Sequence, residues 1–287
     1  MAVYGINGGA LDYVYDVAGA ILQQAYDVAG NGLIDGPVVI PSLVVMSYNV
    51  QDFTGINAQQ ALQNAIVNTY DADIIGIQEF YKQDVVPDIA ANMLASYAHL
   101  YRSTHKNFNA IASQKNLYSI TIADYASQDP EDMSRYSETR CYIKGYFTWA
   151  GRQICFINTH LCYLTDSYKY AQMAELFALA QQEDYVIITG DFNFFALAAD
   201  EPDYINMYKQ FVDAGYKLAD CTEQGFVKTY SNLTSAASLA DFRSAADNII
   251  VSSNINIDSV VFDTTKLSYL DGNVIDHIPV IATLSLT

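Results

Sequence analysis

Basic residues are scarce in this chain of 287 residues, where 14 Lys and Arg stand against 32 Asp and Glu and the formal net charge is −18. No Lys or Arg occurs before Lys82. A secretory signal peptide requires a basic N-terminal region, so the sequence predicts that no such peptide is present. The acidic balance also argues against broad phosphate neutralisation of nucleic acid, although a divalent cation or one locally positive cleft can still bind phosphate.

Long apolar runs and cysteine motifs are absent as well. No stretch approaches 18 uninterrupted apolar residues, so no membrane-spanning segment is predicted. The four cysteines lack CxxC spacing, which favours small buried thiols in a reducing compartment over a disulfide framework or a zinc site. The expected location is therefore the cytoplasm, or a virion if the N-terminal segment described below serves assembly.

The sequence does contain short apolar runs that end in a carboxylate, an amide or an imidazole. Such runs are typical of buried strands, and strand ends can deliver polar side chains to one shared rim. In chain order the motifs are SYNV (47–50), IQEF (77–80), NTHL (158–161), TGDFN (189–193), DNIIVS (247–252) and DHIPV (276–280). They predict one oxygen-rich site for a hard cation with two imidazoles beside it, built from Asn49, Glu79, His160, Asp191, Asn193, Asp247, Asp276 and His277.

The expected elements alternate strands with helices and hairpins. Helices are predicted over residues 57–70, from Thr165 as N-cap, and over 204–214 with a stop at Gly215. Hairpins are predicted around Lys115–Asn116 and across Ala150–Gly151. Two sheets packed face to face with helices on the outside would accommodate this pattern.

The six motifs in this order resemble the endonuclease/exonuclease/phosphatase superfamily, which has the DNase I-like fold. The resemblance runs from about Leu43 to Leu286. It implies an α/β fold of four layers, α/β/β/α, for a domain over residues 43–287, preceded by a short N-terminal extension, residues 1–42.

The N-terminal extension has a different character. YDVAG occurs at residues 15–19 and again at 26–30, which predicts two hairpin-like units or an extended arm. The following stretch, residues 27–38, shares GNG and ID with an EF-hand loop, but Ala29 and Val38 replace two ligands, so we interpret it as a turn. The repeat weakly resembles arms of phage tail and baseplate-type proteins, which would imply assembly through this segment.

The family pattern gives Glu79 the principal metal-binding role, with Asn49 and Asp276 completing the shell. Mg²⁺ is the expected cofactor, with Mn²⁺ as the alternative, because both accept oxygen ligands. Ile275 stands where the family commonly has serine before the Asp–His pair, a departure that lies outside the chemical centre.

Phosphoester hydrolysis requires an activated water and positive charge near the phosphate. His277 is a candidate general base paired with the Asp247 carboxylate, because a carboxylate fixes the imidazole tautomer and raises its basicity. By resemblance, Asp191 orients or activates the water and Asn193 holds a phosphate oxygen. The sequence leaves open whether the histidine or the aspartate is the base.

Further residues are expected to contact the phosphate. His160 belongs to the NTHL motif and resembles the histidine of DNase I-like and sphingomyelinase-like members, whereas the abasic-site repair branch lacks it. As a cation it would bind the scissile phosphate or protonate the leaving group. Arg140 matches a phosphate-contacting arginine, and Asn109 is a further candidate contact. Seven of the 14 basic residues lie between positions 102 and 152, either on solvated faces or along the substrate side of the cleft.

The leading function is a divalent-metal-dependent phosphoester hydrolase, a DNase I-like nuclease or phosphodiesterase that uses an activated water. DNA is one candidate substrate, favoured by His160 and Arg140 and opposed by the net charge. The alternatives are a small-molecule or lipid phosphoesterase of the sphingomyelinase or inositol-phosphatase kind, and a phage structural protein that carries this domain as an accessory. A binding module on an inactive fold is a further class.

Overall fold

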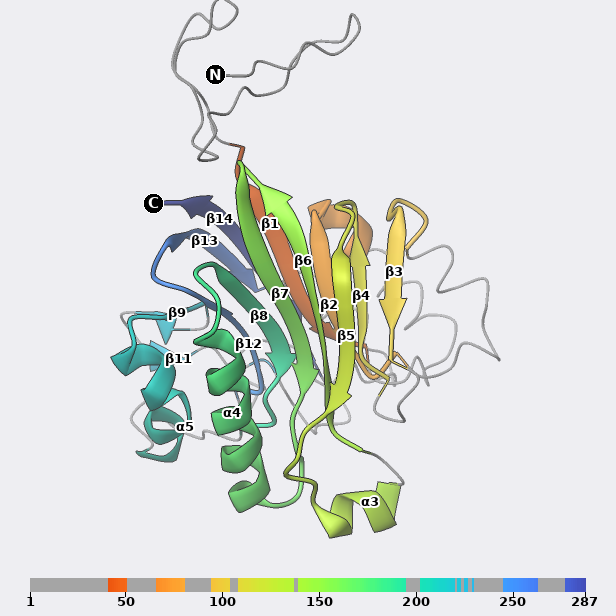
Figure 1. Cartoon of the computed structure of the whole chain (residues 1–287), viewed down its shortest axis with the longest axis vertical. Coiled ribbons are helices and arrows are strands. Elements are labelled where there is room, and N and C mark those ends of the chain that lie inside the picture. The colour runs from red at the N-terminus through yellow and green to blue at the C-terminus, as the bar shows by residue number, and fades with distance from the viewer. Residues whose placement is uncertain are drawn as a thin grey trace, which may run out of the picture.

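The computed structural model describes residues 41–50, 66–80, 94–103, 108–136, 139–194, 202–219, 221–222, 225–226, 229, 245–262 and 277–287. Within these residues, two six-stranded sheets face each other and helices lie on their outer faces (Figure 1). This is the predicted four-layer α/β/β/α arrangement.

The first sheet has the strand order β13-β14-β1-β2-β4-β3. Its strands β1 and β2 are parallel, so their carboxyl ends meet at one edge, and the other neighbours are antiparallel. The strands are β1 (Leu43–Asn49), β2 (Ile74–Gln78), β3 (His99–Arg102), β4 (Ala110–Ser113), β13 (Ile255–Phe262) and β14 (Val280–Leu286).

The second sheet has the strand order β5-β6-β7-β8-β12-β9. Here β7 and β8 form the parallel pair, which places their carboxyl ends together as well. The strands are β5 (Tyr118–Asp124), β6 (Cys141–Trp149), β7 (Arg152–His160), β8 (Val186–Asp191), β9 (Lys217–Leu218) and β12 (Asp247–Val251). A separate two-stranded ribbon consists of β10 (Cys221–Thr222) and β11 (Gly225–Phe226).

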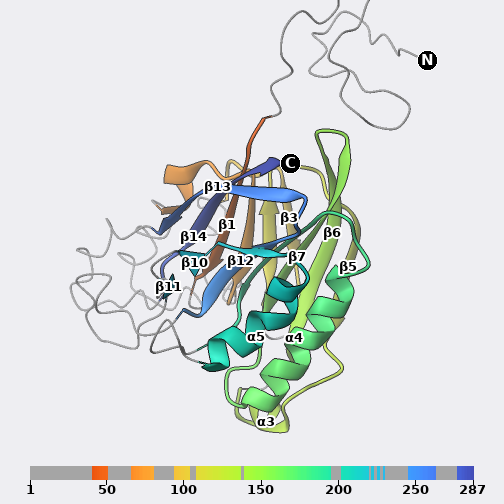
Figure 2. The same ribbon diagram turned by 90° about the vertical axis from the view of Figure 1, so that its left-hand side faces the viewer.

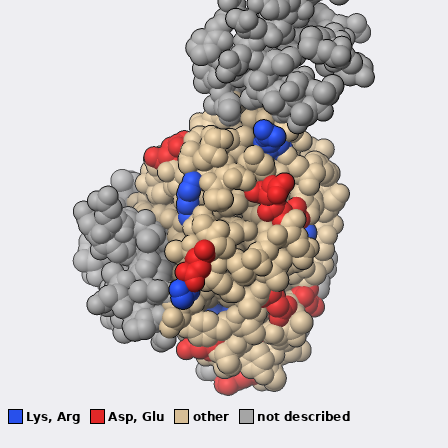
Figure 3. Space-filling model, turned by 60° about the vertical axis from the view of Figure 1, so that its left-hand side comes forward, with Lys and Arg blue, Asp and Glu red and all other residues tan. Residues whose placement is uncertain are grey.

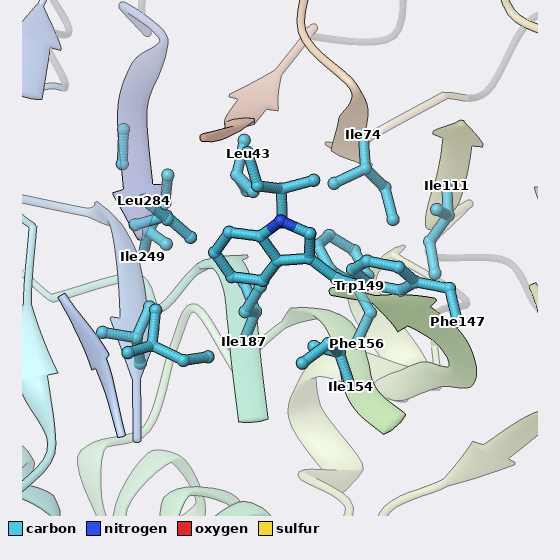
Figure 4. Packing of buried hydrophobic residues seen from close by; sticks show 14 of the residues in the cluster. Leu43, Ile74, Ile111, Phe147, Trp149, Ile154, Phe156, Ile187, Ile249 and Leu284 are labelled. Atoms are coloured by element: carbon cyan, nitrogen blue, oxygen red, sulfur yellow. The ribbon is translucent and has the colours of Figure 1, made fainter. Parts of the chain in front are cut away.

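Three apolar layers hold these elements together. The inter-sheet layer contains Trp149 among aliphatic and phenylalanine side chains of both sheets (Figure 4), and its indole N–H donates to the Pro41 carbonyl at 3.0 Å. Helices α4 (Asp166–Ala180) and α5 (Pro202–Asp213) cover the outer face of the second sheet (Figure 2). Helical residues 66–70 cover the outer face of the first sheet through Ile66 and Val67. The apolar patterns of β2, β4, β8 and β12 thus bury both faces of these strands.

The hairpin predicted around Lys115–Asn116 is wrong. Strands β4 and β5 belong to different sheets, and the turn between them carries the chain from one sheet to the other. Strand β4 is buried and already paired on both sides, by β2 and β3, so no edge is available to β5. The half-exposed β5 pairs instead with β6 as the edge strand of the second sheet.

The other predicted connections are confirmed. Strands β6 and β7 form a hairpin in which Trp149 faces Arg152, and the two turn residues Ala150 (φ 49°) and Gly151 (φ 76°) are both left-handed. Helix α4 follows Thr165 as N-cap, and the chain after α5 turns at Gly215 (φ 85°).

Some predictions fall on residues that the structure does not describe. The helix predicted over 57–70 is described only over 66–70, where it is helical. Residues 1–40, with the YDVAG repeat, the turn over 27–38 and the proposed arm, lie outside the described residues. Cys141, Cys155 and Cys162 are buried free thiols, as predicted. No helix among the described residues is long and apolar enough to cross a bilayer.

Candidate active site

The ends of β1, β2, β7 and β8 and the beginnings of β12 and β14 meet along one margin of the two sheets, which we call the site edge. It lies at the lower ends of these strands in Figure 1, away from the C-terminus. Register places His160 opposite Asp191, and Asp191 opposite Asp247 on its other side. Motifs separated by more than 80 residues thus converge because the two parallel strand pairs end at the same margin.

Asp191 lies at the centre of the site edge and is buried. Its Oδ2 accepts a hydrogen bond from the Asn49 amide at 2.8 Å, and its Oδ1 accepts one from the Asn193 backbone N–H at 2.8 Å. The Nε2 atoms of His160 and His277 each lie 3.6 Å from the same Oδ2. One carboxylate oxygen therefore faces both imidazoles and an amide.

Burial raises the pKa of Asp191 to about 6. The neighbouring Asp247 carboxylate adds to this rise, whereas His277 and the hydrogen bonds from Asn49 and Asn193 oppose it. Because the carboxylate is ionised above this pKa, the site edge holds a desolvated negative charge at pH 7. Such a charge favours a cation beside it.

Glu79 follows β2 with a left-handed backbone (φ 55°). The next residue, Phe80, is buried, and its N–H donates to the Phe108 carbonyl at 2.9 Å, which fixes the turn. The Asn49 amide donates to Glu79 Oε1 at 3.0 Å as well as to Asp191. Two carboxylates therefore converge on one amide, an arrangement that mutual repulsion disfavours unless a cation is bound.

Two overlapping groups of described residues could hold a metal ion. Glu79, His160 and Asp191 form one, and Asp191, Asp247 and His277 form the other, with each group's ligand atoms within 4.8 Å of one another. Asp191 is common to both. Carboxylate oxygens fit Mg²⁺ or Mn²⁺. Asp276, the third predicted ligand, lies outside the described residues.

His277 is held by a carboxylate that has a second partner. Its Nδ1 lies 2.7 Å from Asp247 Oδ2, and the hydroxyl of Thr229 donates to the same oxygen at 2.7 Å. The Asp247 backbone N–H returns a hydrogen bond to the Thr229 hydroxyl at 3.0 Å. This arrangement fixes the tautomer with hydrogen on Nδ1 and leaves Nε2 as a base directed at Asp191.

His160 is buried, and no described residue forms a hydrogen bond with its Nδ1. Burial lowers the pKa of His160 well below its usual value, and the positive charge of Arg140 and the neighbouring His277 imidazole lower it further. The imidazole is therefore neutral at pH 7 in the ligand-free protein. Its predicted cationic role depends on substrate, because a phosphate beside the ring would raise its pKa again.

Arg140 and Asn109 meet near the start of β6. The guanidinium Nε of Arg140 donates to Asp132 at 2.7 Å, and both side chains are buried. Asn109 is buried before β4, where its amide donates to the Cys141 carbonyl at 2.9 Å and its Oδ1 has no partner within the part of the chain that the structure describes. Asn109 therefore connects the two sheets next to Arg140.

Asn193 has a left-handed backbone (φ 52°) and is buried. Its amide nitrogen donates to the Leu161 carbonyl at 2.9 Å, and its N–H supports Asp191. The two residues therefore occupy the same corner of the site edge, although the Asn193 side chain is directed at the backbone after β7.

A buried polar network lies between the sheets behind the site edge. Asn158 donates to the carbonyls of Ile77 and Ala110 at 2.8 Å each. Its Oδ1 accepts from Gln78 at 2.6 Å and from Thr189 at 3.0 Å. All four hydrogen-bonding positions of the amide are filled, so the network fixes the strand that precedes Glu79 against the strands that end in His160 and Asp191.

The sequence did not reveal every residue that organises the site. Three further residues form hydrogen bonds to predicted site residues. Thr229 bonds to Asp247, 18 residues away in the sequence, and Asp132 and Gln128 bond to Arg140, 8 and 12 residues away. None of them stands at the end of an apolar run, so strand patterns carry no signal for them.

The basic segment 102–152 is not a continuous substrate-facing surface among its described residues. Arg102 and Arg140 lie at the site edge, whereas Lys115 and Arg152 follow or begin strands at the opposite end. Lys144 in β6 pairs at 3.4 Å with Glu183, which lies in the turn between α4 and β8. On the face in Figure 3 the basic side chains are isolated and acidic ones are spread around them. Solvated faces therefore account for most of this segment.

The family model described as "Endonuclease/Exonuclease/phosphatase family" matches residues 46–264 of this sequence, about three-quarters of its length. The chain belongs to this family. Its members are phosphoesterase hydrolases and generally require a divalent metal, so the chain belongs to that class of enzyme.

Solved structures of low sequence identity share the fold. A family member from Bacteroides thetaiotaomicron has a TM-score of 0.63 at 16% identity, covering 87% of this chain and 99% of that one. D. rerio TDP2 with a single-stranded DNA product has a TM-score of 0.65 at 16% identity, covering 85% and 99%. A mannosyl-6-phosphatase from Bacteroides thetaiotaomicron has a TM-score of 0.60 at 16% identity, covering 85% and 100%. A search of proteins with curated functions finds no match.

Proposed function

We propose that this chain is a Mg²⁺-dependent phosphodiesterase that hydrolyses its substrate with an activated water. The observation that carries this proposal is the environment of Asp191 Oδ2, which faces both imidazoles at 3.6 Å while Asn49 connects it to Glu79. The proposed base His277, the neutral imidazole of His160 and the carboxylates of Asp191 and Glu79 thus lie close together. Mn²⁺ is the alternative metal.

Glu79 and Asn49 would hold the metal, with Asp276 as the third proposed ligand. The donor set fits, because two converging carboxylates and a raised pKa at Asp191 indicate negative charge that no described cation neutralises fully. When bound, the metal would supply positive charge next to the phosphoryl oxygens as negative charge develops on them.

The chain's own residues divide the remaining work. His277 Nε2 and Asp191 Oδ2 lie 3.6 Å apart, so a water between them would have two candidate bases. Asp191 would accept its proton as a carboxylate, and His277 would accept it at Nε2 because Asp247 holds hydrogen on Nδ1.

Arg140 and His160 would contact the scissile phosphate. Bound phosphate would raise the pKa of His160 so that its imidazole takes up a proton, and the resulting imidazolium would donate that proton to the leaving oxygen. Asn193 would hold Asp191 through its backbone N–H and would also bind a phosphate oxygen. Asn109 would hold the start of β6 next to Arg140 through its hydrogen bond to the Cys141 carbonyl.

DNA and small phosphoesters remain two substrate classes. The family relationship to a DNA-bound structure fits a nuclease, since TDP2 was solved with a single-stranded DNA product. The net charge of −18 favours a small or singly charged substrate, and so does the likeness to a mannosyl-6-phosphatase. Assembly through residues 1–42 stays a prediction.

The test is hydrolysis of bis(p-nitrophenyl) phosphate with Mg²⁺ or Mn²⁺, run beside nicking of supercoiled plasmid and hydrolysis of p-nitrophenyl phosphate. We expect turnover of the diester that EDTA abolishes and that Asp191→Ala lowers by about a thousandfold or more. Plasmid nicking would extend the activity to DNA. Turnover of the monoester alone would replace the diesterase by a phosphatase, and no turnover with any metal would contradict the proposal.

A further inference from the structure

The chain segment that leads into α3 (Pro130–Tyr136) encloses Arg140 from two directions. The Gln128 side chain donates to the Arg140 carbonyl at 2.7 Å and accepts from the Arg140 N–H at 2.8 Å. The same amide nitrogen donates to the Tyr125 carbonyl at 2.8 Å. From α3, Asp132 accepts a hydrogen bond from the guanidinium Nε at 2.7 Å. Both the backbone and the side chain of Arg140 are therefore fixed by one segment.

The Asp132–Arg140 ion pair is not explained by stability alone. Only 1% of the Asp132 side chain and 3% of the Arg140 side chain are exposed, so both charges are desolvated. Among the described residues, Asp132 Oδ1 also has no hydrogen-bond partner, although it is buried. Buried pairs of this kind are often no more stabilising than apolar side chains of the same volume, and an unsatisfied oxygen destabilises further.

The same segment is attached to the chain that follows His160. The Asp129 carboxylate accepts from the Glu131 N–H at 2.8 Å and from the Cys162 thiol at 3.5 Å. Because Cys162 lies two residues after His160, the segment holds its position relative to both proposed phosphate contacts. Figure 1 shows α3 beyond the lower ends of β5 and β6, at the same end of the molecule as the site edge.

We propose that Asp132 is a positioning residue that holds the Arg140 guanidinium in the orientation that receives the substrate phosphate. The inference rests on the proposed function and extends it to a residue outside the six motifs. A guanidinium carries its donors in one rigid plane, so a carboxylate on Nε sets the direction of the remaining N–H groups. A long side chain fixed before substrate arrives loses less conformational entropy on binding.

The test is a double-mutant cycle between Asp132→Asn and Arg140→Ala, measured on the Mg²⁺-loaded full chain. Asparagine preserves the shape of the side chain, so the fold is expected to survive, but the charge-assisted hold on Nε is lost. Two quantities are followed, kcat/KM for bis(p-nitrophenyl) phosphate and the Kd of inorganic phosphate by calorimetry. Asp132→Ala is measured beside it as the stronger perturbation.

We expect Asp132→Asn to weaken phosphate binding and kcat/KM by about three- to tenfold, and to change neither by more than about twofold when Arg140 is already alanine. Equal losses in both backgrounds would show a general structural effect and overturn the proposal. Unchanged or tighter phosphate binding in Asp132→Asn would overturn it too, because an orienting role requires the carboxylate. Glu183→Gln, which alters the Lys144 ion pair away from the site edge, is the matched control and should leave both quantities unchanged.

The two readouts separate this inference from the proposed function. If the wild-type chain hydrolyses no phosphoester while phosphate binding follows the cycle as expected, the proposed function fails and the positioning role stands. If the wild-type chain hydrolyses the diester and the cycle is additive, the positioning role alone falls.

Discussion

Asp191 occupies an environment that opposes its own ionisation. In the unfolded chain its carboxyl would have an ordinary pKa near 4, whereas burial raises the folded value to about 6. Between these values the folded protein binds more protons than the unfolded chain, so stability falls as pH rises through this window. Above pH 6 the full unfavourable contribution is present. The residue at the centre of the site edge therefore weakens the metal-free fold at neutral pH.

Replacing this residue should stabilise the metal-free protein while removing its activity. We predict that Asp191→Asn raises the free energy of unfolding at pH 7 by about 1–3 kcal/mol, because the amide needs no ionisation in a buried position. The difference from wild type should shrink towards zero as the pH approaches 4. Guanidinium denaturation at both pH values, with EDTA present, measures it.

Mg²⁺ should make the wild type more stable than Asp191→Asn, which is the reverse of the order expected in EDTA. A cation bound at the site edge stabilises the folded wild type by RT ln(1 + c/Kd) at a free Mg²⁺ concentration c, which is about 2.7 kcal/mol at a hundred times Kd. Asp191→Asn should gain less, since it lacks one negative charge. A variant that is less stable than wild type in EDTA, or that gains as much from Mg²⁺, would show that desolvation of Asp191 is not the dominant effect.

At the scale of elements, the two sheets approach each other closely at Gly76 in β2. A Cβ placed on this glycine would lie 1.9 Å from Thr189 Oγ1 and 2.5 Å from Asn158 Oδ1. These atoms belong to the fully bonded inter-sheet network, so they cannot move without breaking hydrogen bonds. Glycine is therefore required here by close approach of the two sheets.

We predict that Gly76→Ala destabilises the protein by about 3 kcal/mol or more, at or beyond the upper end of ordinary overpacking. Gly145→Ala is the matched control in β6, because its Cβ would meet the flexible Ile120 Cδ1 at 2.5 Å. That side chain can rotate, so we expect a loss of about 1 kcal/mol. Thermal or denaturant unfolding of the two variants compares them directly, and equal losses would refute the role of the network.

How far the sequence predicts this architecture depends on whether a feature is local. The turn of Ala150 and Gly151, the start of α4 after Thr165 and the buried strands follow from neighbouring residues, and all were predicted. The Lys115–Asn116 turn was misread because a change of sheet and a hairpin have the same local pattern. Only the pairing of β4 on both sides excludes the hairpin.

Among the site residues, too, the sequence predicts those that follow from a local pattern and misses those that depend on tertiary contacts. Six motifs at strand ends brought Asp191, His160, His277 and Glu79 to one margin, because parallel strands end together. Asp132 stayed hidden, because its role depends on a buried contact with Arg140 that no periodicity encodes. The proposed catalytic residues lie at strand ends, where a sequence motif reveals them. The residues that hold them in place are revealed only by tertiary contacts.

For the whole molecule, the net charge of −18 decides how a polyanionic substrate would be bound. Proteins that neutralise many phosphates lose affinity steeply with salt, with a slope of about −0.7 per contact for single strands. Here Arg102 and Arg140 are the two basic side chains described at strand ends on the site edge. Arg102 lies over the Phe80 ring at 5.8 Å, next to Glu79, which places it where a neighbouring phosphate of a longer substrate could pass.

We therefore predict that log(kcat/KM) for a single-stranded oligonucleotide falls with log salt with a slope no steeper than about −1.4, equivalent to two contacts. Arg102→Gln should flatten the slope by about 0.7 and leave hydrolysis of bis(p-nitrophenyl) phosphate unchanged, because that substrate has one phosphate. Arg152→Gln removes an exposed arginine at the opposite end of the sheets and should alter neither. If the oligonucleotide is not hydrolysed, its inhibition of diester hydrolysis supplies the same slope. A steep slope that Arg102→Gln does not change would place the phosphate contacts elsewhere, since a molecule with so few cations at its site edge can neutralise few phosphates there.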